Sequence, residues 1–150
     1  MLIKTHPAMA VLFNSRQTTL GELQQLTGTA IKELYKYVAD LDLLVCGPSY
    51  WFYYGNDGRP ETRFTLDIAI PVFGQVPTAL LPYFKQIPAA KCLSAFHVGS
   101  WQTLPCAYNK MVQYISENGL QMSGNAWEAF LHIDWTRPEN NVTEISIGLL

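Results

Sequence analysis

The strongest constraint on the fold of this chain is an internal echo at a separation of 77 residues. The segment Glu144-Ile145-Ser146-Ile147 repeats Asp67-Ile68-Ala69-Ile70 at this offset. The further matches are Gly124 with Gly47, Trp127 with Tyr50, Tyr114-Ile115 with Tyr37-Val38, Ala107 with Ala30 and, at an offset of 78, Arg137-Pro138-Glu139 with Arg59-Pro60-Glu61. Because the matches are sparse but collinear, the chain is interpreted as two copies of one unit. Two copies are too few for a solenoid and predict one pseudo-symmetric domain with a site between its halves.

Each copy is predicted to contain a strand, a helix and two further strands. Period-two alternation and apolar runs predict strands, whereas apolar residues at helical spacing predict the helices. The expected strands are 8–13, 49–54 and 62–72 in the first copy, and 91–96, 127–135 and 143–149 in the second. The first helix follows Thr29 and the second begins at Thr103 or Leu104, because Pro105 is tolerated only in a first helical turn. Thr19 and Glu22 have the spacing of a capping box.

These elements fill a single domain of 150 residues. The expected boundaries are about 8–72 for the first copy, 73–90 for a connector with one helical turn near 80–84, and 91–150 for the second copy. The first copy is about six residues longer, in the region Leu20–Gly28. The fold class is therefore α+β, with mostly antiparallel sheets, helices packed on one face and pseudo-twofold symmetry.

Composition narrows the class of function. Ten lysines and arginines against twelve acidic residues give a net charge of −2, whereas direct nucleic-acid binding needs a basic patch. No apolar run reaches the length of a membrane span, and no signal-peptide pattern opens the chain. Cys46, Cys92 and Cys106 are expected to be reduced core thiols of a cytoplasmic protein. Neither the cysteines nor the three histidines have metal-ligand spacing, so we expect no metal and no other cofactor.

The last two predicted strands carry the most informative side chains. One side of each strand is apolar, whereas the other side carries Glu128 or Glu144, and in the first of these strands also Phe130. The 77-residue offset extends this group to six residues: Trp51, Tyr53, Asp67, Glu128, Phe130 and Glu144. If the more apolar faces pack on the helices, these six side chains project from the opposite face and line a groove between the half-sheets. A solvated sheet face is the alternative, although such faces rarely include a phenylalanine.

An aromatic wall with carboxylates suits a planar, lipophilic and often cationic ligand. Aromatic rings provide cation–π attraction of about 0.5–2 kcal/mol each. A desolvated carboxylate provides the opposite charge. We expect Glu128 and Glu144 to approach the same cavity, where a general acid–base pair is the catalytic alternative.

The order and spacing of several short motifs resemble one protein family. The motifs are His97-x-Gly99-Ser100-Trp101-x-x-Leu104, Ala107-Tyr108, Asn118-Gly119, Trp127-Glu128 and Thr143-Glu144-Ile145-x-Ile147. Together they resemble the gyrase-inhibitor-like (GyrI-like) family, the effector-binding domain of multidrug-responsive and AraC-type bacterial regulators. The resemblance covers the whole chain and implies two strand–helix–strand–strand units about a pseudo-twofold axis, with a ligand groove between them. It also implies that the glutamate at position 128 contacts the ligand, with the acid at position 144 nearby.

The resemblance implies several possible activities. Some relatives hydrolyse cyclopropane-bearing genotoxins, whereas others sequester toxins or inhibit gyrase. Phe130 stands where relatives usually have tyrosine, which removes a possible proton donor. Trp101 stands where tyrosine is common, and Gly148 replaces the usual proline.

We therefore expect a stand-alone domain that binds hydrophobic, cationic or aromatic small molecules, in drug or toxin sensing or sequestration. The expected ligand-binding residues are Trp51, Tyr53, Asp67, Trp101, Glu128, Phe130 and Glu144. One alternative is a hydrolase of electrophilic, cyclopropane-type toxins in which Glu128 or Glu144 activates water. Another is a protein-binding inhibitor of a DNA enzyme such as gyrase. Because no DNA-binding domain precedes Met1 in this sequence, a role in transcription would require a partner protein.

Overall fold

In the described part of the chain the fold is a nine-stranded antiparallel sheet with two α-helices, which confirms the predicted α+β class. The computed structural model describes residues 1–23, 29–41 and 43–150. The strands are β1 (Leu2–His6), β2 (Met9–Thr18), β3 (Leu44–Val45), β4 (Ser49–Tyr54), β5 (Phe64–Phe73), β6 (Phe84–Ile87), β7 (Ala90–Val98), β8 (Met122–His132) and β9 (Val142–Leu149). The α-helices are α1 (Thr29–Asp40) and α2 (Leu104–Glu117), and the short 3₁₀ helices are η2 (Thr78–Tyr83), η3 (Trp101–Thr103) and η4 (Pro138–Asn140).

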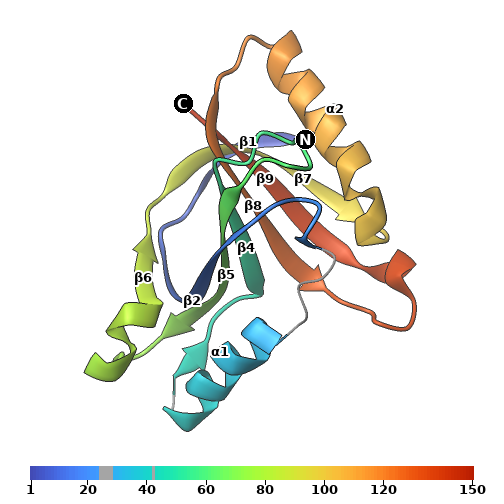
Figure 1. The fold of residues 1–150 in the computed structure, drawn as a ribbon. Helices are drawn as coiled ribbons and strands as arrows, with labels where there is room; N and C mark the ends of the chain where they lie inside the picture. The colour runs from blue at the N-terminus through green and yellow to red at the C-terminus, as the bar shows by residue number, and fades with distance from the viewer. Residues whose placement is uncertain (24–28, 42) are drawn as a thin grey trace.

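The strand registers follow the predicted twofold relation. The sheet order is β1-β7-β9-β8-β4-β5-β2-β6, with β3 paired to β5 (Figure 1). At the centre, Trp51 of β4 lies directly opposite Glu128 of β8, and these residues are 77 apart. The neighbouring pairs keep this offset, since Phe52 pairs with Asp67 and Ala129 pairs with Glu144. The twofold axis therefore passes through the pair of Trp51 and Glu128.

The first copy is longer than the second by four residues rather than the expected six. Val11 pairs with Pro71 and Cys92 pairs with Gly148, so β2 and β7 match at an offset of 81 while β5 and β9 match at 77. The additional residues lie between β2 and β4; the predicted region, Leu20–Gly28, lies within this interval, and its residues 24–28 are outside the described residues. The predicted capping box at Thr19 and Glu22 forms before residues 24–28. The Thr19 N–H donates to Glu22 Oε2 at 3.1 Å, and the Glu22 N–H donates to Thr19 Oγ1 at 3.3 Å.

Both helices cover the same face of the sheet. The cluster under α1 contains Ala30, Leu34 and Val38 with Leu66, Ile68 and Ile70, and the cluster under α2 contains Leu104, Met111 and Ile115 with Leu93, Ile145 and Ile147. Ile68 lies opposite Trp51, and Ile145 lies opposite Glu128, so all four residues point to the helix-covered face. Figure 1 shows α1 and α2 at opposite ends of the sheet, with the central strands β4 and β8 between them. No helix in the described ranges is long and apolar enough to cross a membrane.

Two strands that the sequence analysis did not predict complete the sheet edges. β1 leads into β2 but pairs with β7, and β6 leads into β7 but pairs with β2. β1 and β6, which we call the exchanged arms, therefore each add an edge strand to the half of the sheet that they do not lead into. The predicted helical turn near residues 80–84 is η2, which directly precedes β6.

The face opposite the helices is also buried at its centre. Val11, Phe52, Ala69, Cys92 and Trp127 form an apolar cluster there. Among the cysteines only Cys92 is buried, whereas the other two are exposed, so the expectation of three core thiols is correct for Cys92 alone. The central strands thus carry buried apolar side chains on both faces of the sheet.

Candidate functional site

Glu128 lies at the centre of the helix-covered face and is only 5% exposed. The Tyr53 hydroxyl, from β4, donates to Glu128 Oε2 at 3.0 Å, and the Tyr108 hydroxyl, from α2, donates to Oε1 at 2.9 Å. Within the part of the chain that the structure describes, no lysine, arginine or histidine forms an ion pair with this carboxylate. Glu128 is therefore a buried acid held by two phenols and by no cation.

Burial raises the pKa of Glu128 to about 7, because the charged carboxylate loses its hydration; the hydrogen bonds from Tyr108 and Tyr53 lower the pKa only in part. Burial and the neighbouring Glu128 raise the pKa of both tyrosine hydroxyls well above the ordinary value, so both remain protonated donors. Near neutral pH Glu128 therefore exchanges between its neutral and charged forms.

Four aromatic rings lead from the surroundings of Glu128 to solvent. Trp51 contacts Phe130 with ring centroids 5.5 Å apart, Phe130 contacts Trp101 at 5.4 Å, and Trp101 contacts Trp135 at 5.6 Å. All three contacts are edge-to-face, a favourable geometry for aromatic pairs. Three of the rings are partly buried, whereas Trp135 is 78% exposed. We call Trp51, Phe130, Trp101 and Trp135 the aromatic array.

A local cap and a contact with a distant strand hold Trp101 in the array. It begins η3, where the side chain of Ser100 accepts a hydrogen bond from the N–H of Gln102. Its indole Nε1 donates to Thr143 Oγ1 of β9 at 3.2 Å. The sequence therefore fixes this ring through a local cap and through a strand that is distant in the chain.

Asp67 and Glu144 lie on the opposite face of the sheet and do not join this site. Asp67 pairs with Phe52 and Glu144 pairs with Ala129, and the side chains of Phe52 and Ala129 point away from Glu128. The prediction that Glu128 and Glu144 approach the same cavity is therefore wrong.

The predicted orientation of the remaining four residues is also wrong. Trp51, Tyr53, Glu128 and Phe130 point to the helix-covered face instead of away from it. The reason is that Trp127 and Ala129, which had been assigned to the helix side, are themselves buried on the other face. Because both faces of β8 are buried, the alternation of apolar residues does not identify the side on which the helices pack.

Each of the two excluded acids has its own lysine. Lys4 of β1 forms an ion pair with Glu144, and Lys85 of β6 forms one with Asp67. Burial raises the pKa of Glu144, but the hydrogen bonds from Lys4 and Ser94 outweigh burial, so the pKa lies below its ordinary value. Both exchanged arms thus deliver a counter-charge to the face opposite the helices.

A second sequence echo could have located these lysines and both edge strands. Lys4-Thr5-His6-Pro7-Ala8 and Lys85-Gln86-Ile87-Pro88-Ala89 share the lysine, proline and alanine at an offset of 81. The same offset relates β2 to β7, so Lys4 and Lys85 occupy equivalent positions in the two halves. The offset of this second echo is 81 rather than 77 because the first copy has four additional residues.

The sequence analysis missed two residues of the site, Tyr108 and Trp135. Tyr108 was placed in the second helix and in a family motif but was not predicted to bind the ligand. Trp135 was assigned to the apolar side of a strand that continues to residue 135, whereas β8 ends at His132. The Arg137-Pro138 turn signal was the indication that a loop begins earlier.

The site is closed in this structure. A shallow depression of about 440 Å³ lies beside the C-terminal end of α1, lined by Tyr35, Val38, Ala39, Leu43 and Leu44. Another hollow, of about 90 Å³, is lined by His6 and Trp127 among others. Neither of these two hollows includes Glu128, which is 5% exposed, so a ligand that reaches this carboxylate must displace side chains that cover it. No cluster of three or more potential metal ligands occurs among the described residues.

The fold, with its two similar halves, is that of a small-molecule-binding domain. A family model of the GyrI-like small molecule binding domain matches residues 2–150. The chain belongs to this family, as the sequence motifs predicted. A comparison with curated proteins gives no significant match.

Solved structures share the fold at low sequence identity. The EcmrR–DNA complex in EcmrR-RPo has a TM-score of 0.75 and 22% identity over 99% of this chain, which spans 56% of that chain. SAV2435 bound to tetraphenylphosphonium has a TM-score of 0.66 and 15% identity, covering 100% of this chain and 94% of that chain. A hydrolase from Listeria innocua, encoded by lin2189, has a TM-score of 0.65 and 16% identity over 99% and 91% of the two chains. At such identities the likeness establishes the fold alone.

Proposed function

We propose that this domain binds lipophilic aromatic cations at Glu128, as a cytoplasmic sensor or sequestering protein for drugs or toxins. The observation that carries the proposal is the burial of Glu128 between two tyrosine hydroxyls without a protein cation. A buried carboxylate without a counter-charge is costly, so a ligand cation that supplies this charge gains free energy by relieving the cost. The aromatic array adds stacking and cation–π attraction. Membership of a small-molecule-binding family and the tetraphenylphosphonium complex of SAV2435 support the same ligand class.

The raised pKa of Glu128 links cation binding to proton release. A cation binds the charged carboxylate, and below pH 7 the charged fraction falls about tenfold for each pH unit. The apparent affinity for a cation should therefore fall by about the same factor between pH 6 and pH 5. A neutral ligand of similar shape should bind with little dependence on pH.

Calorimetry with tetraphenylphosphonium and neutral triphenylphosphine oxide tests this proposal. We expect the wild type to bind the cation more tightly at pH 8 than at pH 6, and Glu128→Gln to lose this preference while it retains binding of the neutral compound. The loss for the cation should be about 1–3 kcal/mol, the scale of a hydrogen bond to a charged group. Glu144→Gln is the matched control, because it removes an acid from the other face and should leave cation affinity unchanged. Equal cation affinity of wild type and Glu128→Gln would exclude Glu128 as the charge-binding group.

A second candidate function is hydrolysis of a strained electrophile. A carboxyl group whose pKa is about 7 suits general acid–base catalysis at neutral pH, and the hydrolase from Listeria innocua shares the fold. In this scheme Glu128 removes a proton from water while the water oxygen bonds to the electrophilic carbon. The ring bond breaks, and Tyr53 or Tyr108 protonates the leaving centre and is reprotonated from Glu128.

Mass spectrometry in isotopically labelled water tests this second candidate. Hydrolysis predicts one labelled oxygen in the product with the wild type and no product above background with Glu128→Gln. Saturable binding without any product would exclude the hydrolase and leave the binding function. Interaction with a protein partner stays a prediction from the family resemblance.

A further inference from the structure

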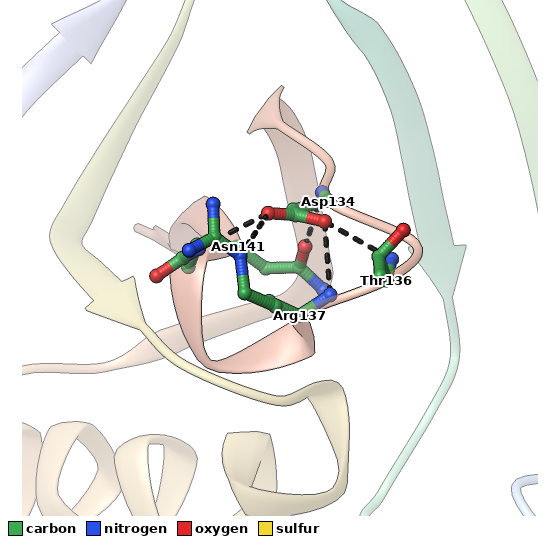
Figure 2. Close-up of polar contacts among 5 residues, drawn as sticks. Asp134, Thr136, Arg137 and Asn141 are labelled. Carbon is green, nitrogen blue, oxygen red and sulfur yellow. Dashed lines mark hydrogen bonds and ion pairs between the residues drawn. The ribbon is translucent and has the colours of Figure 1, made fainter.

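The loop that carries Trp135 is closed by hydrogen bonds on both sides of this residue. Asp134 Oδ1 accepts the backbone N–H groups of Thr136 at 3.0 Å and Arg137 at 2.9 Å, and Oδ2 accepts the side-chain amide of Asn140 at 3.0 Å. The N–H of Asp134 donates to Asn141 Oδ1 at 2.7 Å. Figure 2 shows Thr136, Arg137 and Asn141 around the Asp134 carboxylate. The hydrogen bonds hold the backbone of the loop, so the exposed indole is presented from a fixed support.

Trp135 is the outermost ring of the aromatic array. One side of its indole contacts Trp101 at 5.6 Å with an interplanar angle of 85°, and 78% of the residue is accessible to solvent. Glu128, at the inner end, is 5% exposed. An incoming aromatic molecule can therefore stack on Trp135 before any other ring of the array moves.

The first half of the chain contains the same kind of loop without the ring. Asp57 accepts the N–H of Arg59 at 3.0 Å, two residues further along the chain, as Asp134 accepts the N–H of Thr136. The residue after Asp57 is Gly58, whose φ of +83° favours glycine, whereas the residue after Asp134 is Trp135. An aspartate-capped loop thus forms without a tryptophan, so Trp135 is not required to build the loop.

We propose that Trp135 is an outer aromatic subsite that selects elongated aromatic cations, with the charge at one end and a ring at the other. The inference rests on the proposed function, because it takes Glu128 as the site of the ligand charge. A compact cation reaches Glu128 without extending to the loop. An elongated cation reaches Glu128 and also stacks on the indole, since the array runs continuously between these two points.

Binding of a compact and an elongated cation distinguishes this role from a structural one. The probes are tetraphenylphosphonium and N-methyl-4-styrylpyridinium, whose cationic ring is joined to a phenyl ring by a vinylene link. Trp135→Ala should weaken binding of the elongated cation by about three- to tenfold and change binding of the compact cation by less than twofold. Trp135→Phe should restore most of the loss. Phe96→Ala is the matched control, because Phe96 is an exposed ring on the face opposite the helices.

Trp135 fluorescence gives a second readout that a purely structural residue would not change. Stacking of the styryl cation should quench the emission of the exposed indole, and Trp135→Phe should lose this component of the quenching. Asp134→Ala leaves the ring in place but removes its support, so it should reduce the preference for the elongated cation to a smaller extent.

The outcomes separate this inference from the function on which it rests. If the wild type binds both cations and Trp135→Ala weakens both equally or neither, the outer subsite is excluded and the Glu128 site remains. If the wild type binds neither cation, both proposals are excluded.

Discussion

The two faces of the central sheet bury carboxylates in opposite ways. On the helix-free face Asp67 and Glu144 each have a lysine from an exchanged arm, and the pKa of Glu144 lies below its ordinary value. On the helix-covered face Glu128 has two phenols and, among the described residues, no lysine, and its pKa is raised to about 7. A protein counter-charge therefore distinguishes Asp67 and Glu144 from Glu128, the acid that we propose binds the ligand charge.

Removal of a lysine from the helix-free face should cause the largest loss of stability. Lys85→Met leaves the Asp67 side chain, which is 4% exposed, without its cation. Lys85 also lies over the rings of Phe13 and Tyr54. We expect a loss of about 3–5 kcal/mol in the free energy of unfolding, measured with urea. The double variant Lys85→Met with Asp67→Leu should recover most of this loss. A cost below about 1 kcal/mol for the single variant would show that the ion pair between Lys85 and Asp67 does not stabilise the fold as a buried pair would.

Glu128 should make the protein less stable as the pH rises. Its pKa is about 7 in the folded protein and about 4.5 in the unfolded chain, so the stabilisation is complete below pH 4.5 and is lost as the pH rises through 7. This difference corresponds to about 3 kcal/mol. Urea titrations between pH 4 and pH 8 should show this decline in the wild type relative to Glu128→Gln, in the absence of ligand. Parallel profiles of the two proteins would show that Glu128 is hydrated or paired in solution.

Glu144 should show the opposite dependence with a smaller magnitude. Because its folded-state pKa is lowered, its contribution is present above the unfolded value and is lost as the pH falls through the folded value. Glu144→Gln should therefore cost about 1–2 kcal/mol at neutral pH and nearly nothing in acid. Relative to the wild type, the Glu128 variant should gain stability as the pH rises, whereas the Glu144 variant should lose it. These opposite slopes would confirm the comparison between the faces, and slopes of the same sign would contradict it.

The strand alternation predicted the strands because it is a local property of the sequence, and the repeat predicted their arrangement because it relates elements that are 77 residues apart. Neither pattern could predict the buried face of β8, where Trp127 and Glu128 are equally enclosed by packing from distant segments. Strand parity and the twofold relation placed Trp51, Tyr53, Glu128 and Phe130 correctly relative to one another, whereas Trp101 was placed by the family resemblance. Asp67 and Glu144 lie on the opposite face, where they pair with lysines from edge strands that no local pattern indicated.

The position of the twofold axis restricts what can lie at the centre of the site. In a homodimer of half-length subunits, the two residues that face each other across this axis would be identical. Two glutamates there would repel each other as ions, and two tryptophans would provide no charge. Because one chain contains both halves, position 51 is tryptophan while position 128 is glutamate. A ligand bound at this centre would therefore meet one charged side and one aromatic side, with a stoichiometry of one per chain and a single orientation.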